Sequence, residues 1–540
     1  MSSGISAIKT GSLPKTFRPF NPVKLLLGIF LFVTVICPLA VMLMNMTSSD
    51  ISFVFQMPRF RESLLNSIYA TGTATIISIA LAWGFALCIT RTRIPFREQF
   101  TVFVTLPMLI PSISHGMGLV LLLGANGIIT RFFGLSSSIY GFHGIVLGSV
   151  LYAFPVAFLM LADILKYEDG SPYDAASVLG IPRINQFSSI GFPYLRKPLI
   201  SVVFAVFTLI FTDYGVPLMI GGMYITLPVL MYQEVIGLLN FSRGSVIGSF
   251  LLIPAVIAFV FDLLNRDRAN QNFVILEKRR PENKLRDTFA MCYVIIICLL
   301  IAMPVVVFAF LTFINSYPVD MGLSFRNITR TMNMGAGQYM INSLTISVLV
   351  AIIGTAIAWI TAYFTARTKG KSSRMLHLIS ITSLAIPGLV LGLSYVLFFK
   401  STFLYGSLAI LILVNIVHFM ASPYLMAYNS LGKINSNLED VGRTLGIGRF
   451  HIILDVLIPQ SRQTILEMTS YFFVNSMITI SAVSFLSTVR NRPVSLMINQ
   501  FEAQLFLEGA AFISIVILGC NLLMKSAVYI IAKMQNRKNG

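Results

Sequence analysis

One short motif occurs twice in the chain. Its first copy reads Asp174-Ala175-Ala176-Ser177-Val178-Leu179-Gly180 and is followed, thirteen residues after the glycine, by Pro193. The second copy reads Asp440-Val441-Gly442-Arg443-Thr444-Leu445-Gly446, with Pro459 again thirteen residues after the glycine. A negative charge favours a helix start, and glycine tolerates the left-handed conformation that ends a helix. Both copies are therefore predicted to be short helices that face water, and we interpret them as contacts for a soluble partner.

The rest of the chain is too apolar for a water-soluble domain. Of its 540 residues, 56% are hydrophobic and 11% are charged, and the mean hydropathy is +0.82. The apolar segments are continuous and of membrane-spanning length, whereas a transmembrane β-barrel has short alternating segments. The sequence thus predicts an all-α polytopic membrane protein. Twelve spans are expected, near residues 23–45 (a retained helix rather than a cleaved signal peptide), 64–89, 100–123, 142–165, 195–220, 243–264, 289–314, 340–365, 376–399, 405–429, 465–488 and 508–532.

Basic residues are distributed unevenly between these spans. The net charge is +18, and about three-quarters of the Lys and Arg residues lie in the termini and in alternate connecting segments, which is the positive-inside bias. The charge therefore indicates topology, and no nucleic-acid partner is expected. Both termini and both motif helices are predicted to be cytoplasmic, in a multi-pass protein that contacts the lipid bilayer.

The two halves of the chain are related by an internal repeat. The two tryptophans, Trp83 and Trp359, are 276 residues apart, and the same offset aligns Arg91 with Arg367. It also aligns Asn66-Ser67 with Asn342-Ser343 and Pro111 with Pro387, and an offset of 266 aligns the two motif helices. The expected organisation is a first repeat over 1–264 (core about 60–264), a cytoplasmic linker over 265–288, and a second repeat over 289–540 (core about 336–533). With six spans in each half the repeats are parallel, and a solute pathway would lie on the axis between them.

One acidic residue is expected inside a span. Asp213 lies 17 residues after Arg196, roughly 25 Å along a helix and so in the outer part of the bilayer. Gly215 and Pro217 are predicted to break the helix there, which requires surroundings of protein or water. Because an intramembrane carboxylate is costly, it indicates function. Two interpretations stay open: Asp213 lines a gate or pathway, or it reaches interfacial water from a helix end.

The second half offers hydroxyl groups at the corresponding place. At the 266-residue offset Asp213 aligns with Thr479, and Ser481 follows two residues later. The predicted pathway residues are therefore Asp213 and Tyr214 on one side and Thr479 and Ser481 on the other. One side of such a pathway would be acidic and the other hydroxylated.

The spacing of the two motif helices resembles the EAA loop of type I ABC importer permeases. In that family the loop forms a coupling helix that docks on the ATP-binding subunit. The match is carried by Asp174, Ala175, Ala176, Gly180, Ile190 and Pro193 in the first copy and by Asp440, Gly446, Val456 and Pro459 in the second. The sequence departs from the family pattern where aspartate replaces the usual glutamate and where Val441-Gly442 replaces the alanine pair. The whole chain resembles a fused pair of such permeases, as in importers of ferric iron, thiamine or 2-aminoethylphosphonate.

The resemblance implies a multi-pass protein of a bacterial inner (plasma) membrane, with two tandem six-helix permease repeats that form a solute pathway. It implies a homodimer of ABC ATP-binding subunits and an extracytoplasmic solute-binding protein as partners, and 2-aminoethylphosphonate or ferric iron as the substrate. The chain itself has no nucleotide-binding loop: Gly370-Lys371-Ser372 ends like one, but Thr365 stands where the first glycine is needed. We therefore expect no catalytic residue, no metal site and no cofactor, with ATP bound by the partner. The alternative is a twelve-helix secondary transporter, which would need more intramembrane charges for ion coupling.

Overall fold

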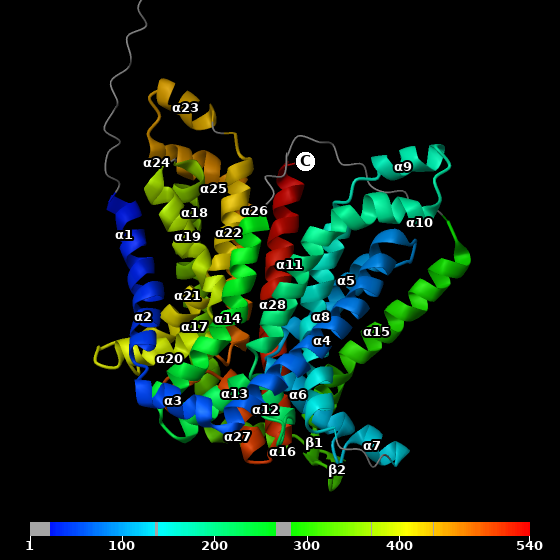
Figure 1. Ribbon diagram of the computed structural model, residues 1–540, viewed down its shortest axis with the longest axis vertical. Helices are drawn as coiled ribbons and strands as arrows, with labels where there is room; N and C mark the ends of the chain where they lie inside the picture. The colour runs from blue at the N-terminus through cyan, green and yellow to red at the C-terminus, as the bar shows by residue number, and fades with distance from the viewer. Residues whose placement is uncertain (1–21, 135–138, 266–281, 369, 436, 540) are drawn as a thin grey trace, which may run out of the picture.

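The chain folds into a bundle of helices with one small hairpin (Figure 1). This computed structural model describes residues 22–134, 139–265, 282–368, 370–435 and 437–539. The helices of the first half are α1 Pro22–Leu31, α2 Cys37–Met44, α3 Ser48–Gln56, α4 Pro58–Arg91, α5 Arg97–Val104, α6 Ser112–Leu123, α7 Ile128–Phe133, α8 Phe142–Lys166, α9 Ser171–Val178, α10 Arg183–Gln186, α11 Phe192–Phe211, α12 Gly215–Ile220, α13 Leu227–Tyr232 and α14 Phe241–Asn265.

The second half follows the same order of elements. Its helices are α15 Lys284–Leu311, α16 Arg326–Thr331, α17 Gly337–Leu349, α18 Thr355–Arg367, α19 Lys371–Thr382, α20 Gly388–Phe399, α21 Leu408–Phe419, α22 Ala421–Lys433, α23 Asn437–Thr444, α24 Arg449–Ile452, α25 Ile458–Gln460, α26 Arg462–Ile478, α27 Ser495–Ala503 and α28 Leu507–Asn539. Within the described residues the only strands are β1 Ile314–Ser316 and β2 Asp320–Leu323, which pair antiparallel. The predicted linker, 265–288, lies largely outside the described residues.

The described chain has nine helices long and apolar enough to span a membrane, or eleven if each of two bent helix pairs is one span. The bent pairs are α19 with α20, at 112°, and α21 with α22, at 53°. The first bend falls at Pro387, which cannot donate a helical hydrogen bond. The remaining predicted span, near 465–488, is represented by the 17-residue α26, which ends at Ile478. The predicted all-α class is confirmed. The twelve predicted spans differ from the observed helices mainly where breaks interrupt the helices.

The first spanning helix of each half packs on the other half. Helices α1 and α2 lie against α18, α19 and α20, where the Tyr395 hydroxyl donates to the Thr34 carbonyl at 2.8 Å. Helix α15, the first of the second half, packs against α4 and α6, and its Tyr293 hydroxyl donates to the Leu81 carbonyl at 2.9 Å. The two halves are therefore interlocked rather than merely side by side.

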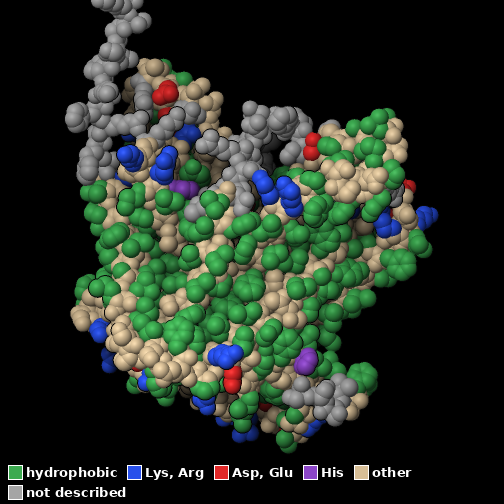
Figure 2. Space-filling view, in the orientation of Figure 1, with side chains coloured by type: hydrophobic (Ala, Val, Ile, Leu, Met, Phe, Trp, Pro, Cys, Tyr) green, Lys and Arg blue, Asp and Glu red, His purple; other side chains and the backbone are tan. Residues whose placement is uncertain are grey.

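The surface has the polarity of a membrane protein. Hydrophobic side chains form a broad band across the face in view, and most charged side chains visible there gather near the two ends of the bundle (Figure 2). The motif helices α9 and α23 lie at one end, together with the start of α1 and the end of α28, whereas α3, α7, α16, α27 and the hairpin lie at the other (Figure 1). Both motifs thus occupy the same end of the bundle, at its edges.

A central cavity and two matching surface helices

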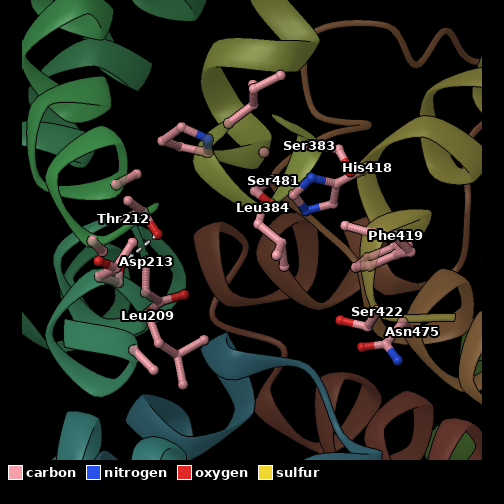
Figure 3. Close-up of a pocket in the computed structure, with 18 of the residues that line it drawn as sticks. Leu209, Thr212, Asp213, Ser383, Leu384, His418, Phe419, Ser422, Asn475 and Ser481 are labelled. Carbon is pink, nitrogen blue, oxygen red and sulfur yellow. Dashed lines mark hydrogen bonds between the residues drawn. The ribbon is translucent and has the colours of Figure 1, made fainter. Parts of the chain in front are cut away.

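A cavity of about 540 Å³ lies between the two halves. Its first-half wall comes from α8, α11, α14 and the break after α11, and its second-half wall from the bends near Pro387 and Phe419 and from α26. Figure 3 shows Thr212 and Asp213 on one side and His418, Ser422 and Asn475 on the other. Among the described residues, no group of three or more His, Cys, Asp and Glu side chains is placed to hold a metal ion. The cavity wall therefore combines one carboxylate with neutral hydrogen-bonding groups.

Three of the four predicted pathway residues line this cavity: Asp213, Thr479 and Ser481. The predicted helix break is present, because α11 ends at Phe211 and α12 begins at Gly215. At the break, the Asp213 carboxylate accepts a hydrogen bond from the Val216 N–H at 3.0 Å and one from the Gly215 N–H at 3.4 Å. Asp213 thus satisfies free backbone N–H groups at a helix start and faces the cavity as well.

The fourth predicted residue, Tyr214, belongs to a layer that joins the two halves. Its hydroxyl lies 2.6 Å from that of Ser484, and its ring stacks on Tyr232 with centroids 5.2 Å apart. Tyr232 stacks in turn on Phe485 at 6.1 Å and accepts a hydrogen bond from the Asn499 amide at 3.4 Å. We call Tyr214, Tyr232, Ser484 and Phe485 the tyrosine layer.

The tyrosine layer lies beyond the end of the cavity that is farther from α9 and α23. Cavity-lining residues of the first half run along α11 from Ser201 to Leu209 and on to Asp213, away from the motif helix that precedes α11. Tyr214 follows directly and is 1% exposed. The cavity therefore extends from the tyrosine layer toward the end of the bundle that carries α9 and α23.

In each half, a glycine and a serine that line or adjoin the cavity lie against each other. The two halves place the glycine and the serine at opposite positions of the repeat. In the first half, a Cβ on Gly215 would lie 2.4 Å from the Ser112 hydroxyl oxygen. In the second half, a Cβ on Gly388 would lie 2.1 Å from the Ser481 hydroxyl oxygen. The repeat aligns Ser112 with Gly388 and Gly215 with Ser481. Each contact thus pairs one glycine with one serine, and the two halves place them on opposite sides.

The two motifs form the predicted short helices, and the same backbone geometry ends them. Gly180 and Gly446 have φ angles of +71° and +72°, the left-handed region that favours glycine. The next residue donates its N–H back to the helix in both copies: Ile181 to the Ala176 carbonyl at 3.0 Å, and Ile447 to the Gly442 carbonyl at 2.8 Å. This is the Schellman pattern of a helix C-terminus.

Local packing accounts for one departure of the second motif. A Cβ on Gly442, where the first copy has an alanine, would lie 2.5 Å from the Ile452 side chain. The residue aligned with Ile452 is Gln186, whose side-chain amide instead donates to the Ile181 carbonyl at 2.8 Å. In the second copy the end of the Ile452 side chain occupies the space beside Gly442, so an alanine there would require that side chain to move.

The two motif prolines also have equivalent surroundings. Pro193 and Pro459 occupy the first turn of α11 and α25. Each follows a π-helical turn, Phe187–Gly191 in the first half and Ile453–Leu457 in the second. A proline lacks the N–H that an α-helix needs, and a widened turn before it is one way to accommodate that loss.

These features agree with the comparison to known families. The family model described as "Binding-protein-dependent transport system inner membrane component" matches residues 92–267 and 354–537. The chain belongs to this family. It is a multi-pass inner-membrane permease component of a binding-protein-dependent transport system.

Relatives extend along most of this permease. It is 27% identical to a ferric transport system permease protein of Actinobacillus pleuropneumoniae over 79% of this chain and 65% of that one. It is 21% identical to the Fe(3+)-transport system permease protein of Haemophilus influenzae, over 80% of this chain and 82% of that one. It is also 21% identical to the thiamine transport system permease protein of Escherichia coli, over 73% and 74%. The chain thus spans slightly less than two thirds of the first of these relatives.

The sequence reasoning missed several residues of this permease's site. Tyr232, Phe485 and His418 are ordinary apolar-segment residues in the sequence, and only folding brings them to the cavity or the tyrosine layer. Ser112 and Gly388 were also missed, although each directly follows an aligned proline. That alignment was the one available signal for them.

Proposed function

We propose that the central cavity is the solute pathway and that α9 and α23 are the coupling helices that receive two ATP-binding subunits. The observation that carries this proposal is the cavity's position: it lies between the halves, with the tyrosine layer at one end and two matching helices at the other. In this arrangement the end with α9 and α23, and both chain termini, face the cytoplasm. Asp174, Ala175, Ala176, Gly180 and Pro193 form the first coupling segment, and Asp440, Gly446 and Pro459 form the second.

Exposed apolar side chains on both helices support a protein partner. Val178 and Leu179 are 88% and 76% exposed, and Leu445 of the second copy is 69% exposed. These side chains follow acidic helix starts at a water-facing end, where lipid does not cover them. Apolar residues exposed together on such a surface are typical of protein docking sites.

Transport would then proceed by alternating access. With the tyrosine layer closed, the cavity is open toward the cytoplasmic end. Approach of the two ATP-binding subunits moves α9 and α23 together, separates Tyr214 from Ser484 and opens the cavity to the extracytoplasmic solute-binding protein. Asp213, Thr479 and Ser481 lie where the solute passes.

Ferric iron is the first candidate solute, because two of the relatives above are ferric iron permeases by name. The second candidate is 2-aminoethylphosphonate. It is favoured by the lining, where one carboxylate, Asp213, faces hydroxyl and amide groups such as Ser422 and Asn475, a combination that suits an ammonium group and phosphonate oxygens. Uptake of radiolabelled iron and aminoethylphosphonate into proteoliposomes, with the cognate binding protein, decides between them.

The coupling role is tested by co-purification of the ATP-binding subunit. Gly180→Pro combined with Gly446→Pro is expected to abolish co-purification, because proline cannot adopt the positive φ of these positions. The rival function, a secondary transporter, predicts uptake driven by a proton or sodium gradient without any ATP-binding subunit. Uptake under those conditions would refute the ABC coupling proposed for α9 and α23.

A further inference from the structure

The repeat aligns Arg91 with Arg367. Each is the last residue of its helix, α4 or α18, at the end of the bundle that carries α9 and α23. Arg91 forms an ion pair with Glu168, which lies between α8 and α9, and its guanidinium donates to the Leu165 carbonyl at 2.9 Å. The Tyr173 hydroxyl, on α9, donates to the same Glu168 carboxylate. A chain of contacts therefore runs from α4 through Glu168 to the first coupling helix.

Arg367 makes the corresponding connection in the second half. Its Nε donates to the Glu439 carboxylate, on α23, at 3.1 Å. Its other nitrogens donate to the carbonyls of Ile434 at 2.7 Å, Asn435 at 3.2 Å and Leu431 at 3.3 Å, all at the end of α22 or in the connection to α23. One planar guanidinium thus joins α18, the end of α22 and the second coupling helix.

The two connections match under the repeat. Leu165 and Leu431, whose carbonyls accept from the arginines, are aligned at the 266-residue offset, as are Tyr173 and Glu439. The coupling-helix position is therefore the same, but its chemistry differs: Glu439 reaches its arginine directly, whereas Tyr173 reaches Arg91 through Glu168. The two halves thus make corresponding connections with different side chains.

The surroundings of both arginines make these contacts strong. Arg367 is 5% exposed and Glu439 18%; Arg91 is 19% exposed and Glu168 5%. Burial together with the nearby Glu168 carboxylate raises the pKa of Tyr173, so its hydroxyl stays protonated and donates. By contrast, the neighbouring pair Arg93 and Glu282 is 50% and 79% exposed, and water screens such pairs to little net effect.

We propose that Arg91 and Arg367 are positioning residues that fix each coupling helix to the spanning helices α4 and α18, so that displacement of α9 or α23 is transmitted to the cavity walls. This rests on the proposed function of α9 and α23. Helix α4 packs on α8 and α11, and α18 on α22 and α26, and α8, α11 and α26 line the cavity. The arginines therefore connect the docking surface to the elements that must move. Loss of either arginine uncouples ATP hydrolysis from transport without releasing the ATP-binding subunit.

The test uses the full permease with its ATP-binding subunits and binding protein in proteoliposomes. Three quantities are measured: co-purification of the ATP-binding subunit, the melting temperature, and the ratio of ATP hydrolysis with loaded binding protein to hydrolysis without it. Arg367→Gln and Glu439→Ala are each expected to lower this ratio about tenfold, since hydrogen bonds between charged groups are among the stronger ones. The double variant is expected to be no worse than Arg367→Gln, because both changes break one connection. Arg93→Gln is the matched control and leaves the ratio unchanged.

Tyr173→Phe is the matching change in the first half. It removes only the hydroxyl that reaches Glu168 and is expected to lower the ratio less than Glu439→Ala. An unchanged ratio in Arg367→Gln and Arg91→Gln, or a loss in proportion to a lower melting temperature or weaker co-purification, would overturn the positioning role. If the wild-type chain retains no ATP-binding subunit, the function proposed for α9 and α23 fails, and this proposal fails with it.

Discussion

The exchanged glycine–serine contacts predict a specific rescue. In Gly388→Ala the new Cβ would lie 2.1 Å from the Ser481 hydroxyl oxygen, 2.9 Å from the Ser481 Cβ and 3.1 Å from the Ala482 nitrogen. Two of these distances are below any normal contact, so a side chain or the backbone must move. Overpacking of this kind costs about 1–3 kcal/mol.

Adding Ser481→Gly removes the two shortest contacts, and of the three nearest atoms only the Ala482 nitrogen, at 3.1 Å, remains. The double variant Gly388→Ala with Ser481→Gly then resembles the first half, where the residue with a side chain, Ser112, begins α6 and the glycine, Gly215, follows the break after α11. We expect it to recover most of the lost stability, which corresponds to a coupling energy of about 0.5–3 kcal/mol. Ser481→Gly alone is expected to cost less than about 1 kcal/mol, because the side chain it removes is small.

The assay is unfolding of the purified permease in detergent micelles, with solute uptake as a second measurement. Gly519→Ala is the control: it lies inside α28, and a Cβ there would meet nothing within 4 Å, so no loss is expected. Wild-type stability and uptake in Gly388→Ala, or failure of Ser481→Gly to restore either, would show that the close approach does not constrain the cavity wall.

Three further outcomes are expected. Gly180→Ala and Gly446→Ala each place a Cβ at positive φ with no neighbouring atom within 4 Å, so the only cost is backbone strain of about 1–2 kcal/mol. The rate of hydrogen exchange in α9 or α23 should therefore rise about five- to thirtyfold. An unchanged exchange rate would contradict the strain. Tyr214→Phe removes the 2.6 Å bond to Ser484 and should lower the free energy of unfolding by about 0.5–1.5 kcal/mol. Because Ser484 also donates to the Ile480 carbonyl, Ser484→Ala is expected to cost more, and the double variant less than the sum of the two single losses; additive losses would exclude a shared bond. Trp359→Phe breaks the buried bond from its indole nitrogen to a serine hydroxyl at 3.0 Å and should cost about 1–3 kcal/mol, whereas the aligned Trp83→Phe, with a half-buried ring, is the comparison expected to cost less.

Much of the fold can be predicted from the sequence because few backbone conformations can cross a lipid bilayer. Continuous apolar segments must be helices, since every backbone polar group needs an internal partner. Gly180 and Gly446 identified both helix ends because only their conformation, and no neighbour, requires glycine. Asp213 with Gly215 and Pro217 also indicated the break after α11, because a proline lacks the helical N–H and an aspartate can cap a new helix start.

Long-range packing could not be predicted in this way. Nothing in the apolar composition of α1 or α15 indicates that each packs on the opposite half, because lipid and protein are equally apolar surroundings. The sequence shows that Arg91 and Arg367 are aligned and lie in basic connecting segments. The carbonyls and carboxylates that they bind lie at least 64 residues away along the chain, so the sequence does not reveal these contacts. Tyr232 and Phe485 meet only across the two halves, so their roles depend on tertiary structure.

The interlocked first helices have a consequence for biosynthesis. Thr34 and the tyrosine that bonds its carbonyl are 361 residues apart, so at about 5–20 residues per second the ribosome needs on the order of 20–70 s to supply that partner. During this interval α2 can pack on α14 of the first half, but its face toward α20 is covered only by lipid or by an assembly factor. Helix α15, by contrast, finds α4 and α6 already inserted. Truncated chains that end before α20 would therefore leave the span formed by α1 and α2 open to membrane proteases, and the order of insertion, rather than the final stability, would decide how much permease a cell recovers.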